Sequence, residues 1–263
     1  MDTRPAAQDS LITLQIREGI AILALNRPKQ YNALSAAVLE AMHEALDRLK
    51  EDESVRVLVI AANGNAFCAG HDLKEMKAAD DQAFVGRLFQ RCSEMMLKIA
   101  KLPVPVIAEV QGMATAAGCQ LVAQCDLAVA AEHAKFAVSG VNLGLFCSTP
   151  AVPLSRAISR KRAAEMLMTG EFIDAATALD WGLVNRVVAA EGLRAETLKL
   201  AETLKAKPRE ALAMGKALFY RQMEAGIEAA YQDASATITC NFTQADAQEG
   251  VAAFLDKRKP EWK

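Results

Sequence analysis

Two short apolar runs open the chain, at residues 11–16 and 20–25, and the turn Arg17-Glu18-Gly19 separates them. This pattern predicts a β-hairpin. After it, Ser35 precedes a stretch in which apolar residues recur every three or four positions, which predicts a capped helix with one buried face. The apolar positions of that helix are Val38, Leu39, Met42, Leu46 and Leu49. The chain therefore begins with a hairpin and a helix that covers a sheet.

The next apolar run, at residues 55–62, is continuous and predicts a strand that is buried on both faces. The pattern then repeats as a helix at 80–101, a strand at 104–110, a helix from about Ala117 and a strand at 126–131. Strands and helices in alternation predict right-handed parallel units, so the first two thirds of the chain should form an α/β core.

The last part of the chain has no further strand candidates. From Glu191 onward the pattern is helical, and Pro208 separates one helix from the next. The sequence therefore predicts an α/β core with the functional site at residues 1–190, followed by a helical region at 191–263. That region should pack on the core or on a neighbouring subunit.

Composition narrows the function classes. The 263 residues are 52% hydrophobic and 24% charged, with a formal net charge of -2. This balance predicts no nucleic-acid partner, because no basic field is present. No apolar run is long enough to insert into a membrane, and the first residues lack the order of a secretory signal. The cytoplasm is the predicted location, with a mature mitochondrial protein as the alternative.

Metal-ligand spacing is absent from the sequence. The six cysteines form no CxxC pair and there are only three histidines, so no metal site is predicted. The cysteines are expected to be reduced, buried thiols. His43 and His133 fall among charged residues and are predicted to lie on the surface.

Two segments rich in small residues follow buried strands, at residues 66–73 and 112–121. In an open parallel sheet, ligands bind beyond the carboxyl ends of the strands, where both segments should lie. Small residues let a ligand approach the backbone, and the second segment leads into a helix whose first N–H groups are free to bind an anionic oxygen. Neither segment contains a nucleotide-binding glycine motif. Periodicity alone leaves open that they are packing turns.

Several motifs in a fixed order make the sequence recognisable. They are Asn26-Arg27-Pro28 with Asn32-Ala33-Leu34, Phe67-Cys68-Ala69-Gly70-His71-Asp72-Leu73, Pro105-Val106-Ile107-Ala108, residues 112–121, Cys125-Asp126, Thr169-Gly170, Trp181-Gly182-Leu183-Val184 and residues 254–258. In these motifs, and over nearly its whole length, the chain resembles the crotonase (enoyl-CoA hydratase/isomerase) superfamily.

The resemblance implies a crotonase fold of repeated ββα units with a C-terminal helical region, assembled as a homotrimer or a dimer of trimers. It implies an acyl-CoA thioester as ligand, with coenzyme A as part of the substrate and no separate cofactor. The N–H groups of His71 and Ala117 would form the oxyanion hole. The implied contacts to substrate and coenzyme A are Arg27, Ala33, Ala69, His71, Asp72, Leu73, Lys74, Ala117, Phe254 and Lys257.

The sequence departs from the family at two positions. In hydratases of this family two glutamates handle the water and its proton, and the motifs align Gln120 and Gly140 with them. An amide has no usable basicity near neutral pH, and glycine has no side chain. Each missing acid or base costs roughly 10² to 10⁴ in rate, so efficient hydration by the usual mechanism is not expected.

Three replacements are open. Gln120 could orient a water or a polar group of the substrate, Ser148 could hydrogen-bond the acyl portion, and space left by Gly140 could admit an anion or a substrate carboxylate. Asp72 is expected to cap a helix rather than to act with His71 as an acid/base pair. Glu109 is expected to make a buried or interfacial hydrogen bond.

Three functions follow from these observations. The first is an enzyme that stabilises a thioester enolate, the second a non-catalytic acyl-CoA-binding or regulatory protein, and the third an isomerase or lyase that uses a substrate carboxylate as base.

Overall fold

The computed structural model describes residues 10–262 and contains two sheets. After an opening hairpin in the larger sheet, each successive pair of strands contributes one strand to each sheet. The larger sheet has the order β1-β2-β3-β5-β7-β10 and the smaller has the order β4-β6-β8-β9. The strands of the larger sheet are β1 (Ile12–Arg17), β2 (Ile20–Leu25), β3 (Val57–Ala62), β5 (Val106–Val110), β7 (Leu127–Ala131) and β10 (Arg186–Val188). Those of the smaller sheet are β4 (Ala66–Cys68), β6 (Met113–Thr115), β8 (Lys135–Ala137) and β9 (Ile173–Asp174).

The predicted hairpin and the predicted parallel core are both confirmed. β1 and β2 pair antiparallel, and β2, β3, β5, β7 and β10 follow one another in parallel. The predicted strands at 55–62, 104–110 and 126–131 each begin one or two residues later than expected. The short strands of the smaller sheet were not predicted, because two or three residues carry too little periodicity to stand out from a turn.

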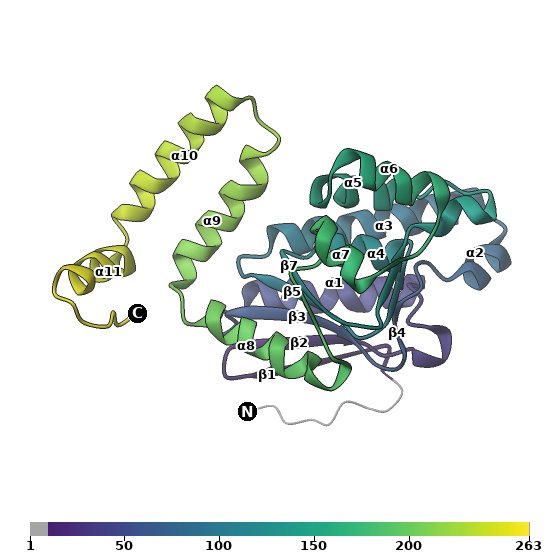
Figure 1. Ribbon diagram of the computed structural model, residues 1–263, viewed down its shortest axis with the longest axis horizontal. Coiled ribbons are helices and arrows are strands. Elements are labelled where there is room, and N and C mark those ends of the chain that lie inside the picture. The colour runs from purple at the N-terminus through teal and green to yellow at the C-terminus, as the bar shows by residue number, and fades with distance from the viewer. Residues whose placement is uncertain (1–9, 263) are drawn as a thin grey trace.

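Helices cover both faces of the larger sheet (Figure 1). The core helices are α1 (Ala36–Glu51), α2 (Leu73–Ala79), α3 (Gln82–Lys101), α4 (Ala117–Gln124), α5 (Ser148–Ala157), α6 (Arg160–Thr169) and α7 (Ala175–Trp181). On the opposite face, α8 (Leu193–Lys205) packs its Leu200 and Ala201 against strand residues such as Ile107. As predicted, the Ser35 hydroxyl caps α1, since it accepts a hydrogen bond from the Val38 amide at 3.3 Å.

The last three helices form an arm that extends away from the sheets, drawn in light green to yellow in Figure 1. They are α9 (Arg209–Gln222), α10 (Ile227–Phe242) and α11 (Ala245–Leu255). No residue of α9 or α10 is buried within the described chain. The arm instead exposes large apolar side chains, namely Phe219, Met223, Ile227, Tyr231, Ile238, Phe242, Val251, Phe254 and Leu255.

A partly buried ion pair fastens the arm to the core. The Lys216 ammonium on α9 lies 2.7 Å from the Asp126 carboxylate and donates to the carbonyl oxygens of Ile99 and Val104 at 2.9 and 3.0 Å. The Tyr220 hydroxyl donates to the same carboxylate at 2.7 Å. Because α3 ends at Lys101, Lys216 supplies a positive charge to a helix C-terminus, where it is favourable.

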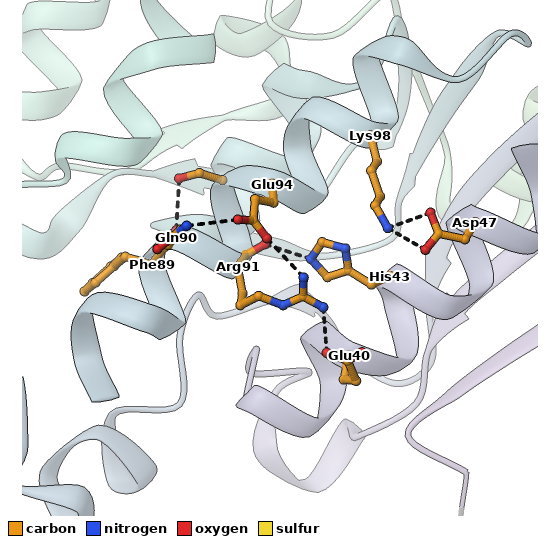
Figure 2. Close-up of polar contacts among 9 residues, drawn as sticks. Glu40, His43, Asp47, Phe89, Gln90, Arg91, Glu94 and Lys98 are labelled. Carbon is orange, nitrogen blue, oxygen red and sulfur yellow. Dashed lines mark hydrogen bonds and ion pairs between the residues drawn. The ribbon is translucent and has the colours of Figure 1, made fainter. Parts of the chain in front are cut away.

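His43 is buried, with 1% of its surface exposed, so the prediction that it lies on the surface is wrong. It faces α3 across the interface between α1 and α3, and its Nε2 atom lies 2.9 Å from the carbonyl oxygen of Arg91 (Figure 2). Around it, the Arg91 guanidinium bridges Glu40 and Glu94. The charged residues near His43 in the sequence indicated a solvent-exposed face of α1. In the structure, α3 packs over that part of α1, and the charged residues lie around the edge of the interface. His133 is exposed, as predicted.

The remaining polar residues of the core agree largely with expectation. All six cysteines are free thiols, and five are buried, while Cys240 on the arm is exposed. Glu109 is buried as predicted, and it forms an ion pair of 2.9 Å with Arg194. Burial raises the pKa of the Glu109 carboxyl, and the Arg194 charge opposes the rise. Between residues 10 and 262, no helix combines the length and apolarity that crossing a membrane requires, and no cluster of three or more side chains there could hold a metal ion.

Candidate functional site

Two strand-to-helix turns meet where the smaller sheet ends. One connects β4 to α2 and the other connects β6 to α4. The Thr115 hydroxyl donates to the carbonyl oxygen of Ala69 at 3.0 Å and joins the two turns. Gly70 has a φ angle of +93°, and a methyl group on it would lie 2.9 Å from the Cβ atom of Ala116 and 3.3 Å from the amide nitrogen of Ala117. The backbones therefore approach so closely that only glycine fits at position 70.

The amides of His71 and Ala117 are free at this junction. On either side of His71 the backbone is paired, because the Leu34 amide donates to Gly70 and the Asp72 amide donates to Leu34. Within residues 10–262 neither the His71 nor the Ala117 amide has a hydrogen-bond acceptor. Ala117 is the first residue of α4, so its amide also lies at the positive end of that helix. The sequence prediction named these two groups, and the turns bring them to the same place.

The backbone at Ala116 is strained. This residue has a φ angle of +49° and a ψ angle of -118°, a combination that side chains disfavour. Its own amide is fixed by a 2.9 Å hydrogen bond to the carbonyl oxygen of Ala137 on β8. Strained backbone that the surroundings hold in place is typical of functional sites.

The side chain of His71 packs against an aromatic ring. Its ring meets the edge of Phe89 on α3 with the centroids 4.6 Å apart. Burial lowers the pKa of His71 to about 4, so the ring carries no charge near neutral pH. Its Nε2 atom is buried and has no hydrogen-bond partner among the described residues.

Asp72 caps α2, as expected. Its carboxylate accepts hydrogen bonds from the amides of Lys74 and Glu75, and the Arg27 guanidinium lies 3.1 Å away. Burial would raise the pKa of Asp72, but the Glu75 amide and Arg27 outweigh it and hold the pKa below its usual value. Arg27 also donates to the carbonyl oxygen of Ala33 at 2.9 Å. Arg27, one of the implied contacts to substrate and coenzyme A, therefore braces the turn within this chain.

Gln120 is a buried amide without partners. Only 3% of its surface is exposed, and its Oε1 atom has no hydrogen-bond donor among the described residues. Helical side chains lean toward the N-terminus of their helix, so Gln120 covers the first turn of α4, where the Ala117 amide lies. A polar group in this setting is free to bind a ligand.

The expected open space at Gly140 is absent, which corrects that part of the sequence interpretation. Gly140 lies in the 3₁₀ helix η2 (Ser139–Leu143), and a methyl group on it would lie 2.8 Å from both the Cys147 sulfur and the Leu145 carbonyl oxygen. The Gly140 amide donates to that sulfur at 3.2 Å. The loop that follows η2 folds back and occupies the place where a side chain on residue 140 would begin.

The other predicted residues divide into two groups. Leu73 and Lys74 are exposed on α2, next to the two turns. Ser148 is exposed at the start of α5, and its hydroxyl donates to the carbonyl oxygen of Phe146 at 3.3 Å. Phe254 and Lys257 lie at the end of the arm, where Figure 1 shows α11 far from α2 and β4. Within one chain they do not join the site.

Three residues near the site were missed by sequence reasoning, namely Phe89, Thr115 and Cys147. Phe89 is one apolar residue of an amphipathic helix, and nothing in the pattern of α3 distinguishes it. Thr115 and Cys147 lie inside motifs that were singled out, but their contacts depend on how separate turns fold together. Only the chain geometry reveals them.

Comparisons with known proteins identify the family to which the chain belongs. Residues 15–263 match the family described as enoyl-CoA hydratase/isomerase. The mouse (Mus musculus) enoyl-CoA hydratase domain-containing protein 3, mitochondrial, is 46% identical over 261 residues, which cover 98% of this chain and 87% of the relative.

Solved structures are also similar. A crystal structure of enoyl-CoA hydratase from Mycobacterium smegmatis superimposes with a TM-score of 0.95 at 58% identity, covering 97% of this chain and 99% of that chain. The crystal structure of human enoyl-CoA hydratase domain-containing protein 3 gives a TM-score of 0.93 at 43% identity, covering 96% of this chain and 100% of that chain. The crotonase fold that the motifs predicted is thereby confirmed, and the chain belongs to the enoyl-CoA hydratase/isomerase family.

Proposed function

We propose that this chain binds an acyl-CoA thioester and stabilises the enolate that forms when a proton leaves the carbon next to the thioester carbonyl. The observation that carries the proposal is the pair of free amides, those of His71 and Ala117, on adjoining turns. The carbonyl oxygen gains negative charge as the enolate forms. Fixed donors that strengthen their bonds to it can lower the barrier by roughly 3 to 4 kcal/mol each.

The coenzyme A portion extends from this hole along the first turn. Ala33, Ala69, Asp72, Leu73 and Lys74 lie on or beside the segment that carries the His71 amide, and they form this part of the proposed site. Coenzyme A arrives as part of the substrate, and no separate cofactor takes part.

A second copy of the chain supplies the remaining contacts of the proposed site, those of Phe254 and Lys257. Phe254 and Lys257 lie on the arm, and the apolar side chains that the arm exposes would remain in water in a single copy. Burying them against other copies favours a homotrimer or a dimer of trimers.

The activity is that of a lyase or isomerase of the family, and efficient hydration by two glutamates is not part of the proposal. Gln120 is an amide, and Gly140 has neither a side chain nor room for one. Gln120 orients a water or a polar group of the acyl chain through its free amide. The hypothesis of an isomerase or lyase with a substrate carboxylate beside Gly140 is not part of the proposal, because the Cys147 sulfur lies in the space that the carboxylate would need.

A specific observation favours a second candidate, a non-catalytic acyl-CoA-binding or regulatory protein. No carboxylate stands at position 120 or 140, and the pKa of His71 is too low for an effective base near neutral pH. Such a protein would keep the two amides as a binding site for the ligand carbonyl.

Titration with acyl-CoA thioesters of short, medium and long chain separates these functions. Binding is measured by calorimetry, and loss of the conjugated enoyl absorbance reports turnover. Binding together with conversion of the ligand supports the enzyme, whereas binding without conversion supports the second candidate. Absence of binding to every thioester, by a protein that melts cooperatively, would refute both.

The oligomeric state has its own test. Light scattering at several protein concentrations should give the mass of a trimer or hexamer, and the double variant Tyr231→Glu, Ile238→Glu on α10 should dissociate it. The control is Gln232→Glu, an exposed polar position of the same helix. A wild-type chain that stays monomeric would contradict the assembly.

The compartment stays a prediction. The sequence favoured the cytoplasm with the mitochondrion as the alternative, and the word mitochondrial in the name of the curated relative supports the alternative. Fractionation of cells that express the tagged chain decides between them.

A further inference from the structure

The sulfur of Cys147 stands where the side chain of residue 140 would begin. It accepts a hydrogen bond from the Gly140 amide at 3.2 Å, and it lies 2.8 Å from the position that a Cβ atom on Gly140 would take. The family resemblance assigns position 140 to one of the two proton-transfer glutamates. The chain that lost this carboxylate therefore has a thiol in the adjoining space.

The thiol also lies at the start of a helix that packs on α4, the helix that carries the Ala117 amide. Cys147 is the residue just before α5, and α5 packs against α4. Burial raises the pKa of the Cys119 thiol to about 12, and the thiol of Cys147 adds to the rise. Cys119 adjoins Gln120, the buried amide without partners. Cys147 thus lies beside Gly140, at the start of the helix that packs on α4.

The chemistry of this thiol is that of an acid. Burial raises the pKa of Cys147, and the hydrogen bond from the Gly140 amide opposes the rise. The thiol is therefore protonated near neutral pH, which makes it unsuited to act as a nucleophile. No nitrogen or oxygen among the described residues accepts its proton. Cys147 is 8% exposed, and the residues just before it are exposed, so water can return a proton after each transfer.

We propose that Cys147 is the proton donor to the carbon next to the thioester carbonyl. This inference rests on the proposed function, because it needs the enolate that the His71 and Ala117 amides stabilise. In the step, the S–H bond breaks, its proton forms a C–H bond with the enolate carbon, and the C=C electron pair of the enolate supplies that bond. The thioester carbonyl re-forms, and the thiolate takes a proton from water. In the reverse direction the thiolate removes the proton, so the same group exchanges the hydrogen on that carbon with solvent.

Hydrogen exchange into a saturated thioester tests the proposal. Butyryl-CoA is incubated with the full-length protein in D₂O, and incorporation of deuterium at the carbon next to the carbonyl is followed by mass spectrometry. The wild-type protein should catalyse exchange. Cys147→Ala and Cys147→Ser should each lower the rate by at least about 10²-fold, because neither side chain replaces a thiol as acid. The dissociation constant for butyryl-CoA should stay within about twofold.

Cys125→Ala is the matched control. Cys125 is also a buried thiol, with the same exposed fraction of 8%, but it ends α4 and does not touch Gly140. The rate of hydrogen exchange catalysed by the Cys125→Ala variant should stay within about threefold of the wild-type rate. Melting curves verify folding, and the serine variant keeps nearly the size of cysteine if the alanine variant unfolds.

The outcomes distinguish the role of Cys147 from the proposed binding of an acyl-CoA thioester. If butyryl-CoA binds but the wild-type protein does not exchange, or if both Cys147 variants exchange as the wild type does, the role of Cys147 is refuted while the binding proposal stands. If butyryl-CoA does not bind to the folded wild-type protein, the proposed function itself fails, and this inference fails with it.

Discussion

A methyl group on Gly70 would lie 3.3 Å from the amide nitrogen of Ala117, so there is no room for a side chain between these two residues. They come from turns that are 47 positions apart in the chain, and the close packing of the turns brings the segments that carry the His71 and Ala117 amides together. Backbone atoms cannot adjust as side chains do. The relative position of the two donors therefore depends on how closely the turns pack.

Replacing Gly70 by alanine should damage ligand binding. The φ angle of +93° is unfavourable for alanine, and its methyl group would push against Ala116 at 2.9 Å. The turns must separate, which moves the His71 amide away from the Ala117 amide. We expect the dissociation constant for an acyl-CoA thioester to rise at least about tenfold, since a lost charge-assisted hydrogen bond costs roughly 1.5 to 3 kcal/mol. Calorimetry measures it.

Gly182→Ala controls for the backbone strain itself. Gly182 has a similar φ angle of +86°, but it ends α7, and its nearest contact would be at 3.9 Å. This variant should lose about 1 to 2 kcal/mol of unfolding free energy with unchanged affinity. Equal loss of affinity in both variants would mean that strain, and not the separation of the turns, governs binding.

Gly140→Ala should destabilise the protein by about 1 to 3 kcal/mol, because its methyl group meets the Cys147 sulfur and the Leu145 carbonyl oxygen at 2.8 Å. Removing the sulfur, in a Cys147→Ala background, should reduce this cost but not abolish it, since the carbonyl oxygen remains. Urea unfolding measures both. For the same reason, adding glutamates at positions 120 and 140 should not restore hydration.

Gly215→Ala is the control, and it should raise the free energy of unfolding where Gly140→Ala lowers it. Gly215 lies within α9 with no atom within 4 Å of the added methyl group, so alanine should stabilise the helix by about 0.5 to 1 kcal/mol. A Gly140→Ala variant as stable as the wild type would show that the loop after η2 can move aside, and space for a side chain would then exist.

The parts of the fold that the sequence predicted are those with strong local patterns. The continuous apolar run that forms β3 and the 20-residue amphipathic helix α3 could be identified from their residues alone. β6 has three residues and β9 has two, and each exists because a neighbouring strand pairs with it. Such elements have no signal of their own.

The candidate site divides in the same way. The family resemblance pointed to the His71 and Ala117 amides, and their role as an oxyanion hole stays a prediction. The filling of the Gly140 space by Cys147 joins residues seven positions apart through a loop whose path no pattern specifies. The error at His43 has the same origin, since burial there depends on α3 packing over α1.

Asp126→Asn should cost about 3 to 5 kcal/mol of unfolding free energy, because it leaves the buried Lys216 ammonium without its carboxylate at 2.7 Å. The double variant Asp126→Asn, Lys216→Met should recover part of this loss, since no buried charge remains unpaired. Urea unfolding at one protein concentration gives the coupling energy. If the losses of unfolding free energy in the single variants Asp126→Asn and Lys216→Met simply add in the double variant, the ion pair does not fasten α9 to the core.

The stability of the protein should fall as the pH drops from about 6.5 toward about 4, in part because of His71. Burial holds the pKa of the folded side chain at about 4, below the ordinary value of 6.5, so between these pH values the unfolded chain binds more protons. The contribution of His71 to stability is complete above about pH 6.5 and is lost as the pH falls, by at most about 1.4 kcal/mol per pH unit. His71→Ala should therefore flatten the pH dependence of unfolding in this window, while His133→Ala, which replaces an exposed histidine, should leave it as in the wild type. The same slope in all three proteins would show that the imidazole of His71 reaches water and is not confined against Phe89.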